Sequence, residues 1–254
     1  SIGLVGSEMC IRDRLGIDIG GSGVKAAIVD TDNGELLSDK IRFQTPENGS
    51  PKKIFDGIAT NFIEELKWKG IVGCGFPGVV KKNKVYSAAN ISKKWIGVNI
   101  KKKFLKKFSL ECRAINDADA AGLSEINLNN KIPKKGTLMI ITVGTGLGTS
   151  IFVDGKLVPN IEFGHLKMYG DCAEKYASNL ARKKLNLTWK EWAARFSEYI
   201  HYIELLVSPN IIVFGGGISK YFHEFESDLI SNCKIIPAKN RNNSGIIGAA
   251  FSAI

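Results

Sequence analysis

The residues best placed for acid–base chemistry are Asn116 and Asp117, which directly follow an apolar run from Cys112 to Ile115. The run predicts a buried strand that ends in an amide and a carboxylate, and the Ala and Gly residues after it predict a closely packed helix. A carboxylate in such a position can act as a base. For an isolated N-D-A-D segment, the simpler interpretation is that Asp117 or Asp119 caps the helix.

Two glycine-rich turns flank this segment and favour a chemical role over a cap. D-I-G-G-S-G at Asp18–Gly23 lies upstream and T-V-G-T-G-L-G at Thr142–Gly148 lies downstream, each after a strand-like run. A third turn, Gly215 to Gly217, follows the apolar run Ile211–Phe214. Glycine allows backbone N–H groups to approach a phosphate. Together the turns and the carboxylate predict a phosphotransferase cleft.

Four further polar residues are candidates, and each also has a simpler interpretation. Asp18 lies within an otherwise apolar strand, where a buried carboxylate needs a cation or a donor nearby. Lys25 could serve a phosphate or be an ordinary surface lysine. Glu162 and His165 are separated by a glycine turn, but a single histidine is more often structural than a ligand.

The elements that position these residues can be predicted from periodicity and turn signals. Strands are expected at Leu15–Ile19, Val24–Val29, Leu36–Phe43, Ile71–Phe76, Thr137–Val143, Thr149–Val153 and Ile211–Phe214. Helices are expected from the cap Ser50 to Leu66, after the cap Asn99, from Cys172 to Leu185, from the capping box Thr188–Glu191 to Val207, and over Gly245–Ile254. The two glycine-turn hairpins echo each other, which indicates an internal duplication.

Composition excludes several classes of protein. With 254 residues and 44% hydrophobic content, the chain can form one large domain or two lobes. No apolar stretch is long enough to cross a membrane. The five cysteines form no C-x-x-C pair, so neither a zinc knuckle nor a disulfide framework is indicated, and a cytoplasmic setting is expected.

The net charge of +10 is concentrated in one segment. From Leu66 to Leu110 there are twelve lysines and no acidic residue, which indicates an anionic partner or simply a solvated face. Interleaved aromatics and a helix-turn-helix are missing from the sequence pattern, so no nucleic-acid partner is expected.

The first fourteen residues are expected to be a non-native leader. They have no hydrophobic period, and Gly6–Arg14 resembles the translation of an adapter used in sequencing libraries, whereas a signal peptide would need an apolar centre. The predicted division is therefore 1–14 as leader, 15–117 as an N-terminal α/β lobe joined by the terminal helix 245–254, and 118–244 as a C-terminal α/β lobe.

Taken together, these motifs resemble those of the ROK sugar-kinase family, and within it the branch that phosphorylates glucose with inorganic polyphosphate. The resemblance covers Leu15–Ile254 and rests on ordered segments: LGIDIGGSGVK, GFPGVV, AANISKKWIGVN, INDADAAG, TVGTGLGTS, PNIEFGHLKM, FGGGISK and NNSGIIGAA. It implies an α/β protein of actin-like/hexokinase (ribonuclease H-like) fold, with two lobes and a central cleft.

The resemblance also implies a role for each matching residue. Asp117 would be the catalytic base, and Asp18 would orient Mg²⁺ through water. The sugar contacts would be Gly78, Asn90, Asn116, Asp117, Glu162, His165 and Glu174. The donor contacts would be Gly20, Gly21, Ser22, Gly23, Lys25, Thr142, Gly144, Thr145, Gly146, Gly148, Gly215, Gly216 and Gly217. Asp119 is expected to face the start of the helix and to tolerate substitution.

One departure from the family concerns metal. Its members usually carry a zinc motif with several cysteines after the histidine, whereas Asp171-Cys172-Ala173-Glu174 keeps one. One thiolate and one imidazole cannot form a tetrahedral structural zinc site, so no zinc is expected.

The expected substrates are glucose and polyphosphate or ATP, and the expected assembly is a homodimer. The alternatives are an ATP-dependent hexose kinase and, because Asp117 is present, less readily a non-catalytic sugar sensor.

Overall fold

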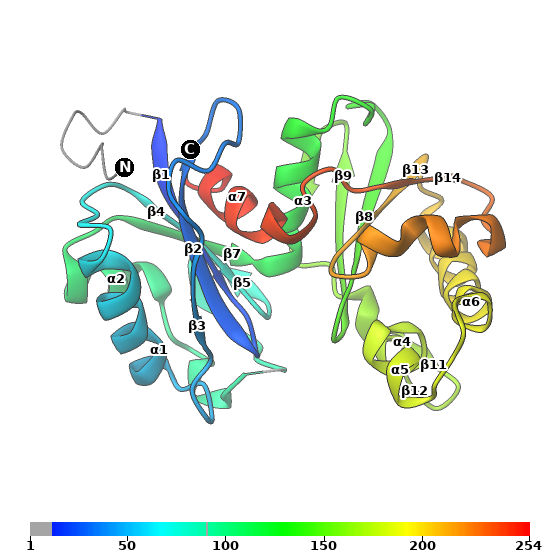
Figure 1. The fold of residues 1–254 in the computed structure, drawn as a ribbon, viewed down its shortest axis with the longest axis horizontal. Helices are drawn as coiled ribbons and strands as arrows, with labels where there is room; N and C mark the ends of the chain where they lie inside the picture. Colours follow the sequence, from blue (N-terminus) through cyan, green and yellow to red (C-terminus); the bar gives the residue numbers. More distant parts are fainter. Residues whose placement is uncertain (1–11, 90) are drawn as a thin grey trace. The chain divides into compact units, whose positions relative to one another are not determined.

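The computed structural model describes residues 12–89 and 91–254, which form two compact units (Figure 1). The first unit contains the chain up to Ala120 and, in addition, Gly245–Ile254. The second unit is Ala121–Ser244. Within the described ranges, no helix combines the length and apolar character needed to cross a membrane.

The strands of the first unit are β1 (Asp13–Ile19), β2 (Gly23–Asp30), β3 (Ile41–Gln44), β4 (Val72–Phe76), β5 (Val80–Lys81), β6 (Lys84–Val85) and β7 (Cys112–Asn116). Those of the second are β8 (Thr137–Val143), β9 (Leu147–Val153), β10 (Lys156–Val158), β11 (Lys167–Met168), β12 (Asp171–Cys172), β13 (Ile211–Gly215) and β14 (Lys234–Pro237). The α-helices are α1 (Pro51–Ile58), α2 (Ile100–Phe108), α3 (Asp117–Leu128), α4 (Ala173–Ala177), α5 (Asn179–Lys184), α6 (Trp189–Val207) and α7 (Ser244–Phe251).

The main sheet of the first unit has the order β3-β2-β1-β4-β7. β2 is antiparallel to β1 and β3, whereas β4 is parallel to both β1 and β7. The carboxyl ends of β1, β4 and β7 therefore lie at one edge of the sheet, with Phe76 opposite Asn116 in register. This arrangement brings the first glycine turn, the G-F-P-G turn and Asp117 to the same edge.

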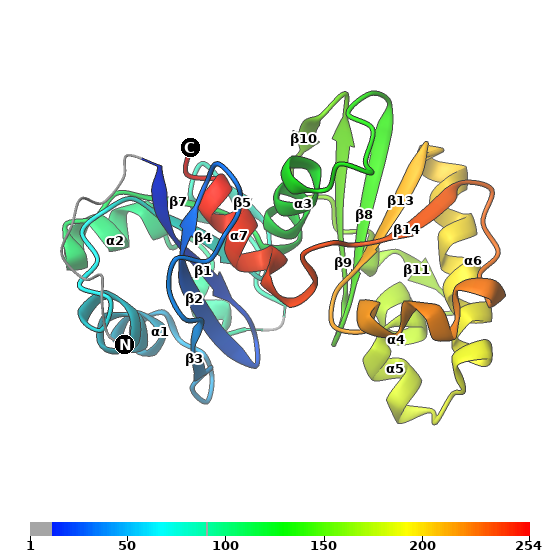
Figure 2. The same cartoon turned by 45° about the horizontal axis from the view of Figure 1, so that its top comes forward.

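Helices cover both faces of this sheet (Figure 2). On one face, Phe55 of α1 and Phe104 of α2 pack edge to face in a core shared with β1 and β4. On the other face lies α7, whose backbone approaches so closely that a Cβ on Gly16 or Gly73 would overlap the carbonyl oxygens of Ile246 or Ala249. Glycine at these two positions is what allows the terminal helix to pack on the sheet.

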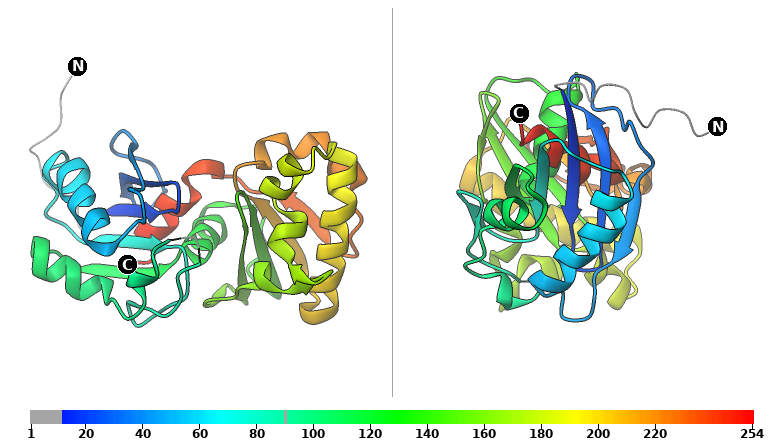
Figure 3. Two further views of the ribbon diagram at one scale, coloured as in Figure 1. Left: turned by 90° about the horizontal axis from the view of Figure 1, so that it is seen from below. Right: turned by 90° about the vertical axis from the view of Figure 1, so that its left-hand side faces the viewer.

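The second unit repeats this topology. Its sheet has the order β10-β9-β8-β13-β14, and the strand directions match those of the first sheet position by position. Met139 and Ile141 of β8 face a core with α6, whereas Leu138 and Ile140 face a smaller core with Ile126 of α3. The left view of Figure 3 shows this sheet from below, with α6 in yellow on one of its faces. The internal duplication expected from the two hairpins is therefore present.

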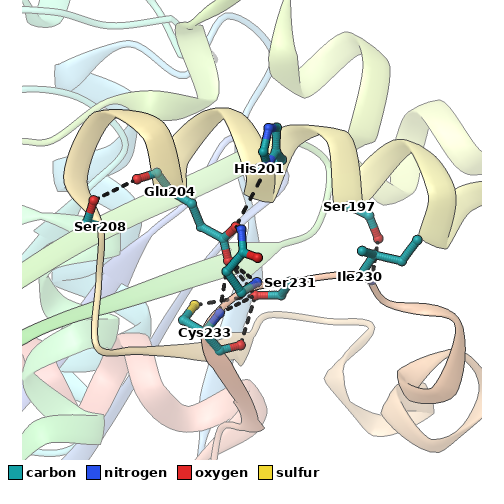
Figure 4. Close-up of polar contacts among 8 residues, drawn as sticks. Ser197, His201, Glu204, Ser208, Ile230, Ser231 and Cys233 are labelled. Atoms are coloured by element: carbon teal, nitrogen blue, oxygen red, sulfur yellow. Dashed lines mark hydrogen bonds and ion pairs between the residues drawn. The ribbon is translucent and has the colours of Figure 1, made fainter.

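A buried carboxylate ties α6 to the segment before β14 (Figure 4). Glu204 accepts hydrogen bonds from the Ser231 hydroxyl at 2.6 Å and from the backbone N–H groups of Asn232 and Cys233 at 2.8 and 3.1 Å. Burial alone would raise the pKa of Glu204, but these hydrogen bonds outweigh burial and lower it. The carboxylate is thus held ionised as a structural link.

The predicted start of the third strand was wrong, and the predicted helix from the cap Ser50 to Leu66 is present but differs in detail. The third strand begins at Ile41 instead of Leu36, which forms only a single bridge to Val29, and the Ser38 hydroxyl accepts the Ile28 N–H instead of a strand partner. Ser50 occupies the N-cap of α1, but its side chain makes no cap hydrogen bond. After Ile58 the helix continues as a π-helix over Ala59–Glu64.

The amino-terminal boundary also differs from expectation. β1 begins at Asp13, which pairs with Asp30, and Arg14 pairs with Val29. The Thr31 hydroxyl and N–H both donate to the carbonyl of Arg12. The last residues assigned to the leader are therefore part of the sheet, while residues 1–11 lie outside the described part of the chain.

Candidate active site

Asn116 and Asp117 lie where β7 ends and α3 begins. The Asn116 side-chain oxygen accepts the N–H groups of Ala118 and Asp119 at 2.8 and 3.0 Å, so Asn116 caps α3. Its side-chain nitrogen donates to the Gly78 carbonyl at 3.2 Å. Asn116 therefore supplies the helix cap that could have been the role of Asp117 or Asp119.

Asp117 is the first residue of α3 and is half-buried. It accepts the Ala118 N–H at 2.8 Å, and the amino end of a helix favours a negative charge. Asp119 is 1% exposed, so it is buried in the first turn of α3, and its tolerance of substitution stays a prediction. Of the two carboxylates, Asp117 is the one accessible to a substrate.

Gly78, the next expected sugar contact, follows β4 in a tight turn. A Cβ there would overlap the carbonyl oxygen of Ser87, and the Ser87 hydroxyl accepts the Val79 N–H at 2.8 Å. The turn therefore requires glycine to let the 87 loop approach. Asn90, expected to contact sugar from that loop, lies outside the described residues.

The first donor turn joins β1 to β2 and is held at two points. Gly20 N–H donates to the Gly23 carbonyl at 3.0 Å, and the Thr45 hydroxyl donates to the Gly20 carbonyl at 2.5 Å. Gly21 and Ser22 are exposed at the tip. The turn is thus fixed at its base and open at its tip, as a phosphate loop requires.

Asp18 and Lys25 form an ion pair beside this turn, with Lys25 Nζ 3.6 Å from the carboxylate. Burial raises the pKa of Asp18, and Lys25 partly opposes that rise. Lys25, expected to serve the donor, therefore also neutralises Asp18.

Arg42 is a cation near the donor turn that sequence reasoning missed. It lies on β3 opposite Lys25, and its guanidinium covers Gly23 so closely that a Cβ there would be 2.7 Å from Nε. Its side chain is exposed. The alternation I-R-F-Q in the sequence indicates that Arg42 lies on the polar face of a strand. Its position opposite Lys25 depends on the register of β2 with β3, which the sequence does not show.

The second donor turn joins β8 to β9. Gly144 N–H donates to the Gly146 carbonyl at 3.0 Å, and Thr145 is exposed between them. Thr142 and Gly148 are opposite each other in the strands and not in the turn itself.

In the same unit, Gly215 ends β13, and Gly216 packs against the backbone of Val143 with φ +84°. A Cβ on Gly217 would meet no atom within 4 Å. Gly216 therefore has a packing role, whereas Gly217 is open for a ligand.

Glu162 precedes a short 3₁₀ helix over Phe163–His165, and His165 is the last residue of that helix. The His165 Nε2 atom is 3.8 Å from Glu162, and both side chains are partly exposed. The Thr149 hydroxyl fixes the segment to β9 by accepting the Phe163 N–H and donating to the Ile161 carbonyl. The two groups present a carboxylate and an imidazole to solvent, as sugar hydroxyls require.

Glu174 lies on α4 with its carboxylate against Gly146. His165, Cys172 and Glu174 bring one ligand atom each to within 4.8 Å of one another. The sequence argument against zinc counted the imidazole and the thiol but not this carboxylate. Structural zinc takes four protein ligands, and three donors leave such a site incomplete, so the absence of zinc stays a prediction.

Comparison with known proteins places the chain among sugar kinases. Residues 14–191 match the model of the ROK family. The chain is 36% identical over 244 residues to the polyphosphate glucokinase of Mycobacterium tuberculosis, covering 96% of this chain and 92% of that protein. It is 39% identical to the inorganic polyphosphate/ATP-glucomannokinase of Arthrobacter sp. strain KM, with a TM-score of 0.89 over 95% of this chain and 98% of that one.

A more distant relative supports the fold. The ROK family glucokinase of Streptomyces griseus superposes with a TM-score of 0.81 at 23% identity, covering 95% of this chain and 99% of that one. With the two matching five-stranded sheets, this confirms the predicted α/β fold of hexokinase type.

Proposed function

The chain belongs to the ROK family, and we propose that it transfers a phosphoryl group from inorganic polyphosphate to glucose, producing glucose 6-phosphate. Support comes from two relatives above 35% identity whose names include polyphosphate, each matched over more than nine-tenths of both chains. The observation that carries the proposal is the position of Asp117, half-buried at the start of α3, with the helix cap supplied by Asn116.

Asp117 is the proposed base. It removes the proton of the sugar 6-hydroxyl as that oxygen attacks the terminal phosphorus of the donor. The bond from that phosphorus to the bridging oxygen breaks, and the donor leaves one phosphate shorter. Such a reaction needs positioning and charge neutralisation more than covalent help.

The remaining site residues bind and orient. Asn116, Gly78, Asn90, Glu162, His165 and Glu174 are the proposed sugar contacts. Gly20–Gly23 and Gly144–Gly148 are the proposed donor contacts, together with Lys25 and Gly217, and Arg42 is added here as a cation over the first turn.

Mg²⁺ fits Asp18, because the carboxylate oxygens that this ion prefers are provided there beside the donor turn. The ion would supply charge neutralisation on the phosphates. Lys25, 3.6 Å from the same carboxylate, partly offsets the rise in the pKa of Asp18 that burial causes. A homodimer and a cytoplasmic setting remain predictions, and ATP is the alternative donor.

Replacing Asp117 with Asn tests the base. The amide keeps the shape and can still accept a hydrogen bond from Ala118, so folding and glucose binding should persist while kcat falls by roughly 10²–10⁴. Glucose binding is measured by calorimetry and turnover by coupled formation of glucose 6-phosphate. Turnover near the wild-type rate would contradict the assignment.

A further inference from the structure

A polar cavity opens beside the first donor turn, within the first unit. Its volume is about 580 Å³, within the ~300–1,000 Å³ range of small-molecule sites. Three segments line it: Gly21 at the tip of the turn, residues 45–49 after β3, and Ala89 with residues 91–93. Among the described residues, Gly21 is the one proposed donor or sugar contact that lines this cavity.

The walls of the cavity are linked to the donor turn by hydrogen bonds. Thr45 donates to the Gly20 carbonyl at 2.5 Å, and the buried indole of Trp95 donates to the Gly49 carbonyl at 2.8 Å. Gly49 has φ +40°, and a Cβ there would be 2.8 Å from the Ile91 side chain. The wall is therefore fixed from the donor turn to the short 3₁₀ helix Lys93–Trp95.

Lysine side chains at one side of the cavity favour the binding of an anion there. Lys93 lines the cavity and Lys94 follows it, and both are exposed. No ion pair among the described residues involves either lysine, so their charges are available to a ligand. Glu47 also lines the cavity and would repel an anion, which makes it a useful probe.

We propose that this cavity is a subsite for polyphosphate residues beyond the one transferred, with the polymer passing from Gly21 to Lys93. The inference rests on the proposed function. Within the lysine-rich Leu66–Leu110 segment, it assigns an anionic partner to Lys93, which lines the cavity, and to the adjacent Lys94.

The test uses two helix caps. Ser92 accepts the Lys94 N–H and Asn99 accepts the Lys102 N–H, and aspartate fills either role equally well. Ser92→Asp puts a negative charge in the cavity wall, and Asn99→Asp puts the same charge outside the cavity-lining set. The two variants therefore differ in place and not in net charge or capping.

For long-chain polyphosphate, Ser92→Asp should raise KM about fivefold and leave kcat unchanged, whereas KM for ATP should stay the same. Asn99→Asp should change neither. Glu47→Gln should lower KM for polyphosphate alone. Lys93→Gln should make the slope of log(kcat/KM) against log salt shallower by about one, by analogy with other polyanions.

The subsite would be overturned if Ser92→Asp raised KM equally for polyphosphate and for ATP, or if Asn99→Asp raised KM for polyphosphate as much as Ser92→Asp does. So would an unchanged KM for polyphosphate in Ser92→Asp. These outcomes are distinct from failure of the proposed function, which is a wild-type protein that forms no glucose 6-phosphate from polyphosphate. In that case binding of polyphosphate is measured directly by thermal shift on wild type and Ser92→Asp. A smaller shift for Ser92→Asp supports the subsite, and an equal shift for the two proteins overturns it.

Discussion

At the scale of single residues, the proposed site contains groups that could be predicted from the sequence and one, Arg42, that could not. Asp117 and the glycine turns were predictable because a polar group at the end of an apolar strand is unusual and costly. Arg42 was not, because its proximity to Gly23 depends on the register of β2 with β3. The role of Asn116 as the cap of α3 was missed for a similar reason, since several side chains near a helix start can accept the same N–H groups.

Arg42 provides a prediction at this scale. Arg42→Gln removes a cation that covers the donor turn, so kcat/KM for both phosphoryl donors should fall about tenfold while the dissociation constant for glucose stays the same. Steady-state kinetics and glucose calorimetry measure the two quantities. Arg113→Gln, an exposed arginine on β7, is the matched control and should be neutral. If both variants lose the same activity, Arg42 has no specific role.

The cluster of His165, Cys172 and Glu174 gives a second residue-scale prediction. Three donor atoms within 4.8 Å fall short of the four that structural zinc takes, so the purified protein should contain no stoichiometric zinc. Elemental analysis measures this directly. One tightly bound zinc per chain, lost in Cys172→Ala, would show that the thiol is a ligand.

At the scale of elements, buried carboxylates that accept hydrogen bonds fix the connections around β14. Glu125 of α3 is 1% exposed and accepts the N–H groups of Lys239 and Asn240, each at 2.8 Å. Glu204 plays the same part for the segment 231–233. Neither link was predictable, since each joins residues that are far apart in the chain.

Glu204→Gln should lower the free energy of unfolding by about 1–3 kcal/mol at pH 7, because the buried donors lose a charged acceptor. The pKa of Glu204 is below its ordinary value of 4.5, so wild type keeps this stabilisation above that pH and loses it as the pH falls through the lowered pKa. The difference between the two proteins should therefore shrink in acid. Urea unfolding of both proteins at pH 7 and at a pH below the lowered pKa of Glu204 measures this difference. Glu226→Gln, at an exposed position, is the control. A constant difference would contradict the linkage.

At the scale of the whole molecule, the fold was predictable because its two hairpins repeat one pattern around two glycine turns. Strand order was not visible in the sequence, but the repeat limited the choices to a duplicated sheet, and both sheets share one order and one set of directions. The packing of α7 on the first unit depends on Gly16 and Gly73, whose need for glycine appears only when the helix is in place.

Use of polyphosphate as the phosphoryl donor can be observed directly by ³¹P NMR. Wild-type protein is freed of nucleotide and incubated with glucose, Mg²⁺ and long-chain polyphosphate, and the products are followed by ³¹P NMR. We expect a glucose 6-phosphate signal that grows as terminal phosphate is consumed, at a higher efficiency than with ATP at equal phosphoryl concentration. No glucose 6-phosphate from polyphosphate, with normal formation from ATP, would contradict it.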